Sequence, residues 1–277
     1  ALCQSAERTA VSSNGAMPVY VIGTEVPVPG GETESLATLD VTPSERARNT
    51  IKTHHQAFLD AGLDDAWDRV VALVVQPGVE FNHTEVHAYD KQAARRLSQS
   101  VLEFPRLVFE AHSTDYQPRP AYSELVNDHF AILKVGPQLT FALREALFAL
   151  SSIEEQLVPP RDWSRFPEVC EEEMLADPVH WESHYPQHEP EGRIYRRFSF
   201  SDRIRYYLPR PRIQQAVERL MTNLDAIEIP LPVLSQYLPH AYEVVRDGRI
   251  EPTAHELVIN HIMTISTMYS EACHESE

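Results

Sequence analysis

Four short apolar runs, rich in β-branched residues, recur in the first half of the chain, and each is followed by a polar segment, which in three of the four contains Gly or Pro. Such runs predict buried β-strands. They lie at residues 19–22, 70–75, 107–109 and 131–135, and helical patterns lie between them at 44–61, 89–102 and 122–129. We expect Ser44 to be the N-cap of the first of these helices. Strands that alternate with helices at these spacings predict a parallel sheet of the α/β class.

The pattern changes after residue 135. A long amphipathic stretch at 138–157 is followed by further helical patterns at 168–175, 204–207, 211–224, 231–246 and 253–269. Residues 159–160 and 181–192 read as loops, and the opening ALCQSAERTAV reads as part of a helix. The sequence therefore predicts two parts, a domain with the strands at 1–157 and a helical extension at 158–277.

Composition excludes several classes of protein. The chain has 24 Lys and Arg against 41 Asp and Glu, a net charge of −17, which repels nucleic acid and anionic membrane surfaces. No apolar run approaches the ~20 residues that span a bilayer, and the start carries no signal-peptide pattern. The three cysteines, Cys3, Cys170 and Cys273, are far apart and form no CxxC pair. We therefore expect buried or incidental thiols, a cytoplasmic location, and neither a nucleic-acid nor a membrane partner.

The polar segments after the strands are the strongest functional signal. They read YVIGTEVPVPGGE, VVQPGVEF, FEAHSTDYQ and ILKVGP. In parallel α/β folds, ligands bind at this end of the sheet. Side-chain alternation places Glu110 and His112 on one face, so we expect them to converge with Glu25 and Lys134 on one pocket. Such polar groups also form structural salt bridges that close a core. Four polar strand ends in succession exceed that need, which favours a small-molecule pocket, functional or vestigial.

Two further patterns are weaker. His83 and His87 have the i, i+4 spacing of a metal site, but HTEVH lacks the HExxH order, and we expect them to be exposed loop histidines. The segment SDRIRYYLP carries Arg203 and Arg205 beside two tyrosines. These arginines suit a phosphate or a partner protein, and pairing with the abundant carboxylates is an equally good interpretation.

Several catalytic motifs are missing from the sequence. It contains no GxxxxGK[ST] phosphate loop, no GxGxxG and no GxSxG. A nucleotide-dependent kinase built on either glycine-rich device, and an α/β-hydrolase, are therefore unsupported.

The strand-end segments, together with HFAILKVGPQLTFALREA and SDRIRYYLP, closely resemble the Z-type subunits of class II tagatose-1,6-bisphosphate aldolases. The resemblance runs over almost the whole chain. It implies a (β/α)8 TIM barrel, of which the four strands here are the C-terminal half. The other half is then expected outside this chain or from another chain. It also implies galactitol or N-acetylgalactosamine catabolism and a partner, the Y-type catalytic subunit, which carries the zinc.

The resemblance also implies which residues occupy the zinc positions of the catalytic relatives. FEAHSTDYQ looks like the LHG-type strand end, so His112 is the retained ligand-like residue. VQPG stands where those relatives have an AHG-type segment, so Gln76 or Pro77 replaces the second histidine. The Asp-His strand end of the third lies outside the chain, and TEVPVPGG supplies Glu25, Gly30 and Gly31. A catalytic zinc needs about three protein ligands, so we expect no metal and no cofactor in this subunit.

The candidate pocket residues are Glu25, Gln76, Glu80, Glu110, His112, Asp115 and Lys134, and a sugar phosphate is the natural candidate ligand. Three functions stay open. In the first, the chain is an accessory subunit that stabilises an aldolase. Alternatively, it is an enzyme that acts directly on a phosphorylated sugar, as an aldolase or a tagatose-6-phosphate kinase. The third possibility is a sensor of sugar phosphates.

Overall fold

The computed structural model describes residues 1–24 and 39–274, and their contacts form two compact units. The first, here called the sheet unit, comprises Ala1–Phe81, Glu85–Val135 and the chain from Tyr269 onward. The second, the helical unit, comprises Asn82–Thr84 and Gly136–Met268. The predicted boundary after residue 157 differs from the contact boundary at 135, and the domain boundary stays a prediction, since contact units need not coincide with domains.

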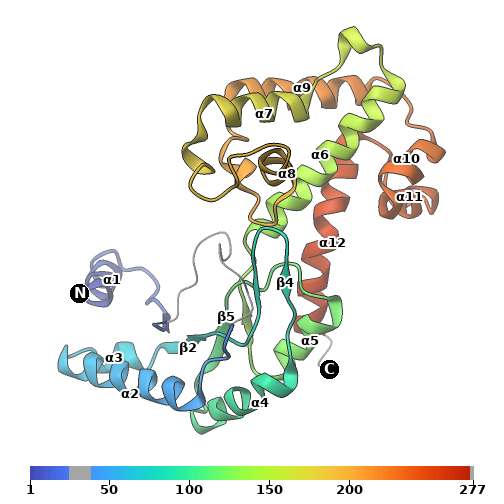
Figure 1. Ribbon diagram of the computed structural model, residues 1–277. Helices are drawn as coiled ribbons and strands as arrows, with labels where there is room; N and C mark the ends of the chain where they lie inside the picture. Colours follow the sequence, from blue (N-terminus) through green and yellow to red (C-terminus); the bar gives the residue numbers. More distant parts are fainter. Residues whose placement is uncertain (25–38, 275–277) are drawn as a thin grey trace. The chain divides into compact units, whose positions relative to one another are not determined.

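Four parallel strands form the sheet of the first unit (Figure 1). They are β1 (Tyr20–Ile22), β2 (Val70–Val75), β5 (Val108–Ala111) and β6 (Ile132–Leu133), in the order β1-β2-β5-β6. All three pairings are parallel, with Val74 opposite Glu110 and Ala111 opposite Leu133. The predicted α/β class and parallel sheet are confirmed, and the carboxyl ends of all four strands lie at one edge.

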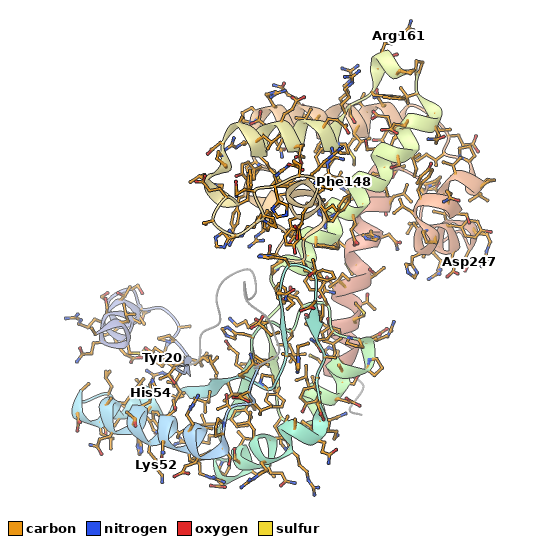
Figure 2. All side chains as sticks on the ribbon, in the orientation of Figure 1. Tyr20, Lys52, His54, Phe148, Arg161 and Asp247 are labelled. Carbon is orange, nitrogen blue, oxygen red and sulfur yellow. The ribbon has the colours of Figure 1, made fainter. Side chains whose placement is uncertain are left out.

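Three helices connect the strands of the sheet, and each falls in a predicted helical stretch. They are α2 (Ser44–Asp60), α4 (Lys91–Ser100), with a 3₁₀ turn at Val101–Glu103, and α5 (Arg119–Asn127). Helix α1 (Leu2–Ser12) precedes β1, and the short helix α3 (Asp64–Trp67) was not predicted. Helix α2 packs against β2 and α4 (Figure 1). The side chain of Tyr20, labelled in Figure 2, donates a hydrogen bond to Glu7 of α1, which links that helix to the first strand.

The predicted N-cap of α2 was wrong. Pro43 is the N-cap and Ser44 is the first helical residue, and no side chain caps the helix. Proline precedes Ser44 with extended backbone, which starts the helix one residue earlier than the cap preference of serine indicates. Asp90 is a cap that the sequence analysis missed. Its carboxylate accepts hydrogen bonds from the first-turn amides of α4, at 2.8 Å from Gln92 N and 3.2 Å from Ala93 N.

A short antiparallel hairpin was also not predicted. Strands β3 (Glu80–Phe81) and β4 (Val86–His87) pair with each other, and the tip between them, Asn82–Thr84, belongs to the helical unit. Two-residue strands carry too short an apolar pattern to be recognised in a sequence.

The core of the sheet unit is built on β2 and β5. Leu73, Val75, Phe109 and Ala111 are at most 2% exposed, and the ring of Phe109 stacks on that of Phe130 at 5.6 Å. Burial of one such apolar side chain contributes about 1.5–3 kcal/mol. Burial on both faces accounts for the continuous apolar run of β2, VVALVV.

The helical unit contains no strand among its described residues. Its elements are α6 (Pro137–Leu157), α7 (Phe166–Ala176), α8 (Glu191–Phe198), α9 (Pro211–Asp225), α10 (Leu231–Tyr237), α11 (Pro239–Arg246) and most of α12 (Ala254–His274), with 3₁₀ turns at Pro160–Asp162, Pro178–His180 and Arg203–Tyr206. Its core includes Phe166, Tyr207, Ile213, Leu220 and Leu234.

Two predictions in this region were wrong. The stretch 231–246 is two helices rather than one, because Pro239 cannot donate the next helical hydrogen bond and instead begins α11. Helix α8 begins at Glu191, inside a stretch that we predicted as a loop up to 192. The prolines of that stretch end before Glu191, and the helix is stabilised by packing that the sequence does not display.

Gly23, directly after β1, is required by the close approach of β2. A Cβ atom at position 23 would lie 2.7 Å from Val74 Cβ. We therefore expect Gly23→Ala to lower the free energy of unfolding by about 1–3 kcal/mol, because the two strands must separate. Urea denaturation followed by circular dichroism measures this effect. The control is Gly15→Ala, whose Cβ would meet only the flexible side chain of Ser13. Equal stability of both variants would contradict the prediction.

Candidate functional site

Three predicted site residues lie together at the carboxyl ends of β5 and β6. His112 Nε2 lies 2.7 Å from Glu110 Oε1, and Lys134 Nζ lies 3.6 Å from the same oxygen. Glu110 is a residue of β5, His112 follows that strand, and Lys134 follows β6. One carboxylate therefore holds both an imidazole and an ammonium group.

Backbone hydrogen bonds fix the positions of these side chains. Lys134 N donates to Ala111 O at 2.9 Å, which extends the β5–β6 pairing. Thr114 donates twice to Lys134 O, from its amide at 3.3 Å and from its hydroxyl at 2.8 Å. Tyr269 of α12 donates to Thr114 O at 3.0 Å. The segment after β5 is thus held from both sides.

The three groups differ in their access to solvent. The side chain of Glu110 is 5% exposed, that of His112 24% and that of Lys134 54%. A buried carboxylate requires partners, and the two cationic or donor groups supply them. The ammonium of Lys134 keeps enough exposed surface to meet an anionic group from solution as well.

The side chain of Gln76 stabilises the turn at the end of β2. Its side-chain oxygen accepts hydrogen bonds from Gly78 N at 2.8 Å and Val79 N at 2.9 Å. Its backbone N–H donates to Thr42 Oγ1 at 2.8 Å. The turn needs Gly78, whose φ of 93° is strained for other residues. Gln76 therefore shapes the loop after β2 through its side chain.

The other predicted pocket residues are buried or outside the described chain. Glu80 is 3% exposed in β3, where its carboxylate accepts a hydrogen bond from Phe81 N, and Asp115 is 2% exposed. Glu25, Gly30 and Gly31 lie outside the described residues. The assignment of all these residues to a ligand pocket stays a prediction.

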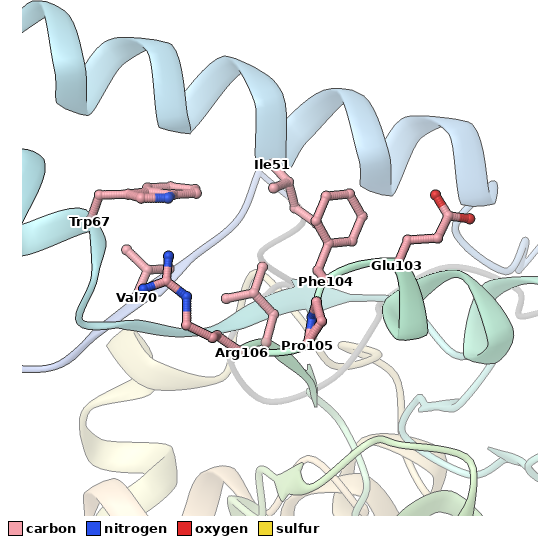
Figure 3. A pocket seen from close by; sticks show the side chains of 8 residues that line it. Ile51, Trp67, Val70, Glu103, Phe104, Pro105 and Arg106 are labelled. Atoms are coloured by element: carbon pink, nitrogen blue, oxygen red, sulfur yellow. The ribbon is translucent and has the colours of Figure 1, made fainter.

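A cavity of about 180 Å³ lies at the opposite end of the sheet, beside the starts of β2 and β5 (Figure 3). Trp67, Ile51 and Phe104 are among its apolar lining residues (Figure 3). Its charged rim residues are already paired, Glu103 with Arg48 at 2.6 Å and Arg106 with Asp68 at 2.8 Å. The cavity therefore offers little polar recognition, and the carboxyl-end cluster is the better candidate site.

The described part of the chain holds neither a candidate metal cluster nor a candidate membrane span. No group of three or more His, Cys, Asp or Glu residues is placed there to hold a metal ion. No helix in the same residues is long and apolar enough to cross a bilayer.

Comparison with known families identifies the chain. The family described as D-tagatose-1,6-bisphosphate aldolase subunit GatZ/KbaZ-like matches residues 1–274. The chain belongs to this family. The predicted resemblance is thereby confirmed over nearly the whole chain.

Individual relatives agree with the family assignment. The chain is 49% identical over 272 residues to the D-tagatose-1,6-bisphosphate aldolase subunits GatZ of Salmonella dublin and Salmonella enteritidis PT4. These matches cover 98% of this chain and 64% of each relative, so the chain spans slightly less than two thirds of their length. A crystal structure of a probable tagatose 6 phosphate kinase from Sinorhizobium meliloti 1021 superposes with a TM-score of 0.87 at 44% identity, covering 98% of this chain and 67% of that one.

The SDRIRYYLP segment of this family member is largely buried in the helical unit. Arg203 donates to His180 O at 2.8 Å, and Arg205 donates to Asp202 O at 3.0 Å and stacks on Tyr206. We had also expected these two arginines to pair with carboxylates. These hydrogen bonds go instead to backbone carbonyl oxygens. A role of the two arginines toward a phosphate or a partner stays a prediction.

A second part of the segment forms a buried ion pair. Asp202 Oδ1 accepts a hydrogen bond from Arg144 Nε at 2.9 Å, and Thr140 donates to its other oxygen at 2.7 Å. Burial raises the pKa of Asp202, and Arg144 opposes that shift. The Arg144 guanidinium also lies 4.0 Å from the ring centre of Phe141. Removal of one residue of such a pair leaves the charge of the other buried and uncompensated.

His83 was predicted to be exposed, and that prediction was wrong. It is 9% exposed, and its Nδ1 lies 3.1 Å from Ser201 Oγ and 3.3 Å from Ser199 Oγ. Tyr185 Oη lies 3.0 Å from Ser201 Oγ and also accepts a hydrogen bond from Arg203 N. The partners are more than a hundred residues away in sequence, so only folding brings them to the hairpin tip. No local signal could have revealed this contact.

Burial of His83 predicts a pH dependence of stability. Desolvation, with smaller contributions from Arg203 and His184, lowers its pKa to about 4. In the unfolded chain the group takes up a proton near pH 6.5. Stability is therefore lost as the pH falls from about 6.5 to about 4, by up to roughly 3 kcal/mol, because only the unfolded chain binds the proton in that window.

Denaturant titrations across this pH range test the expectation. The His83→Asn variant should show a clearly shallower loss of stability on acidification than the wild type. His87→Asn, at an exposed position of β4, should keep the wild-type dependence. An unchanged slope in His83→Asn would refute the assignment.

Proposed function

We propose that this chain is part of an accessory subunit that binds and stabilises the catalytic Y-type subunit of a class II tagatose-1,6-bisphosphate aldolase. The names of its relatives, aldolase subunits, support a role within a larger enzyme. In this proposal the catalytic partner holds the zinc, and this subunit carries no cofactor. The assembly serves galactitol or N-acetylgalactosamine catabolism in the cytoplasm.

The proposal rests on one observation. The side chains at the ligand-like positions form hydrogen bonds within the chain. His112 Nε2 is engaged by the buried Glu110 carboxylate at 2.7 Å. The resemblance sets Gln76 or Pro77 against the second histidine of catalytic relatives, and the side-chain oxygen of Gln76 accepts hydrogen bonds from the backbone of Gly78 and Val79. One histidine and one glutamine at these positions support the proposal that the catalytic zinc is held by the partner, since a catalytic site needs about three protein ligands. The contacts of His112 and Gln76 serve to hold the strand ends in place.

We further propose that the four-stranded sheet is half of a (β/α)8 barrel. The sheet is parallel throughout, as a barrel requires, and β1 and β6 are its outer strands. Val19 and Val21 are 65% and 43% exposed at the β1 edge. Apolar side chains beside an open edge favour pairing with further strands.

A second candidate function is contact with a sugar phosphate. The exposed ammonium of Lys134 and the half-buried imidazole of His112 lie at the end of the sheet where α/β folds bind ligands. A phosphate group there would meet a cation that Glu110 only partly neutralises, since the Lys134–Glu110 distance is 3.6 Å. This contact serves either substrate handling by an enzyme or sensing.

Assays with and without the catalytic subunit test the proposal. We expect the chain alone, supplied with zinc, to leave tagatose 1,6-bisphosphate uncleaved. Added to the Y-type subunit, it should co-purify with it and increase its specific activity or its lifetime at elevated temperature. Cleavage or phosphorylation of a sugar phosphate by the isolated chain would overturn the accessory role.

Variants at the strand-end cluster separate the two candidates. His112→Asn and Lys134→Ala should leave stimulation of the partner unchanged if the cluster only holds the sheet. If the chain handles a sugar phosphate, both variants should bind that compound roughly tenfold more weakly in calorimetry, because each removes a hydrogen-bonding group. Ser152→Ala, a substitution in α6 of the helical unit, is the matched control.

A further inference from the structure

A cavity with several polar lining residues lies within the helical unit. Its volume is about 200 Å³, enough for a ring-sized molecule, since an engineered 150 Å³ cavity holds benzene. It is lined by Ser151, Glu154 and Glu155 of α6, and by Trp163, Arg165 and Glu168, which lie in the turn before α7 and in α7 itself.

Ser151 has a buried hydroxyl without a partner. The residue is 2% exposed, and within the described chain no group forms a hydrogen bond with its Oγ atom. Its neighbour Ser152 behaves differently and donates to Phe148 O at 3.2 Å, the usual solution for a serine inside a helix. A buried unpaired hydroxyl is unfavourable, and a ligand in the cavity that Ser151 lines would supply the missing bond.

Glu154 gives the cavity a fixed acidic wall. It is fully buried, and its carboxylate accepts hydrogen bonds from Ser164 Oγ at 2.6 Å and from Asn223 Nδ2 at 2.6 Å. These bonds hold it in one orientation. A ligand would thus meet a pre-organised wall rather than a mobile side chain.

Arg165 supplies the opposite chemistry. Its guanidinium has no hydrogen bond or ion pair with any other residue that the structure describes, although carboxylates are abundant in this protein. Its backbone is left-handed, with a φ of 53°, at the N-cap of α7. The planar fork of donors is therefore available to oxygen atoms of a ligand.

We propose that this cavity binds a small unphosphorylated polyhydroxylated molecule, such as a simple sugar or a linear polyol. Hydroxyl groups donate to carboxylates and accept from a guanidinium and a serine hydroxyl, so one ligand class satisfies all of these groups. The indole of Trp163 offers an apolar face for the CH groups of such a molecule. The lining holds three carboxylates and one guanidinium, and Glu168 is also paired with Arg197 at 3.4 Å. The remaining excess of negative charge disfavours a phosphate group.

Calorimetric titration of the intact chain tests the proposal. The probes are D-glucose, D-mannose and D-glucitol, with D-glucose 6-phosphate and putrescine for comparison. We expect saturable binding of at least one neutral probe, and binding about tenfold weaker or absent for the phosphate ester. Ser151→Ala and Arg165→Ala should each weaken the binding about tenfold, because each removes a hydrogen-bonding group.

Two matched controls accompany these variants. Ser152→Ala removes the neighbouring, already paired hydroxyl, and Arg161→Ala removes an exposed arginine at the turn labelled in Figure 2, which does not line the cavity. Both should bind the probe as the wild type does, and so should Glu110→Gln in the sheet unit. This last result separates the cavity from the proposed aldolase role.

Thermal melts distinguish lost binding from lost folding. Ser151→Ala should melt no lower than the wild type, because it removes an unpaired buried hydroxyl. Three results would overturn the proposal. They are no binding of any neutral probe, preferential binding of putrescine, and binding that Ser151→Ala and Arg165→Ala both leave unchanged.

Discussion

The parallel pairing of β5 with β2 on one side and β6 on the other is the constraint on which the candidate site depends. It sets Val74 opposite Glu110 and Ala111 opposite Leu133, so that residues distant in sequence leave the sheet at one level. The hydrogen bond from Lys134 N to Ala111 O continues this ladder beyond the last strand residues. A shift by one residue would turn Glu110 to the other face and dissolve the cluster with His112 and Lys134.

The helical unit is organised by a different interaction, a set of polar groups buried among apolar helices. Asp202 and Arg144 form an ion pair that is almost completely buried, and the next residue along, Arg203, donates to a backbone carbonyl. The hairpin tip contributes His83 to the same region through the two serines at 199 and 201. Such a network specifies one arrangement of the segment, because each unmatched group would be costly to bury. The arginines of SDRIRYYLP, which resemble an anion-binding motif, therefore form hydrogen bonds within the protein.

Membership of the GatZ/KbaZ-like family and the local geometry bear on function in different ways. The family matches residues 1–274 and connects the chain with an aldolase. The geometry concerns what the chain's own residues do, and at the strand ends they bind one another. His112 is held by Glu110, and Gln76 builds a turn. The described polar side chains at the strand ends are thus engaged within the chain, and the fold alone assigns them no function.

The sequence by itself determined the four strands of the parallel sheet and most helices. β2 was predicted to the residue, because six consecutive apolar residues can only be buried on both faces, and α9 was predicted to within one residue by its apolar periodicity. It also placed Glu110, His112 and Lys134 at one edge, since carboxyl ends of parallel strands coincide. Tertiary structure alone decided the rest. His83, Arg144 and Arg203 find their partners on other segments of the chain, and local periodicity or propensity carries no signal for such contacts. The burial of the unpaired Ser151 hydroxyl is likewise set by how the helices pack.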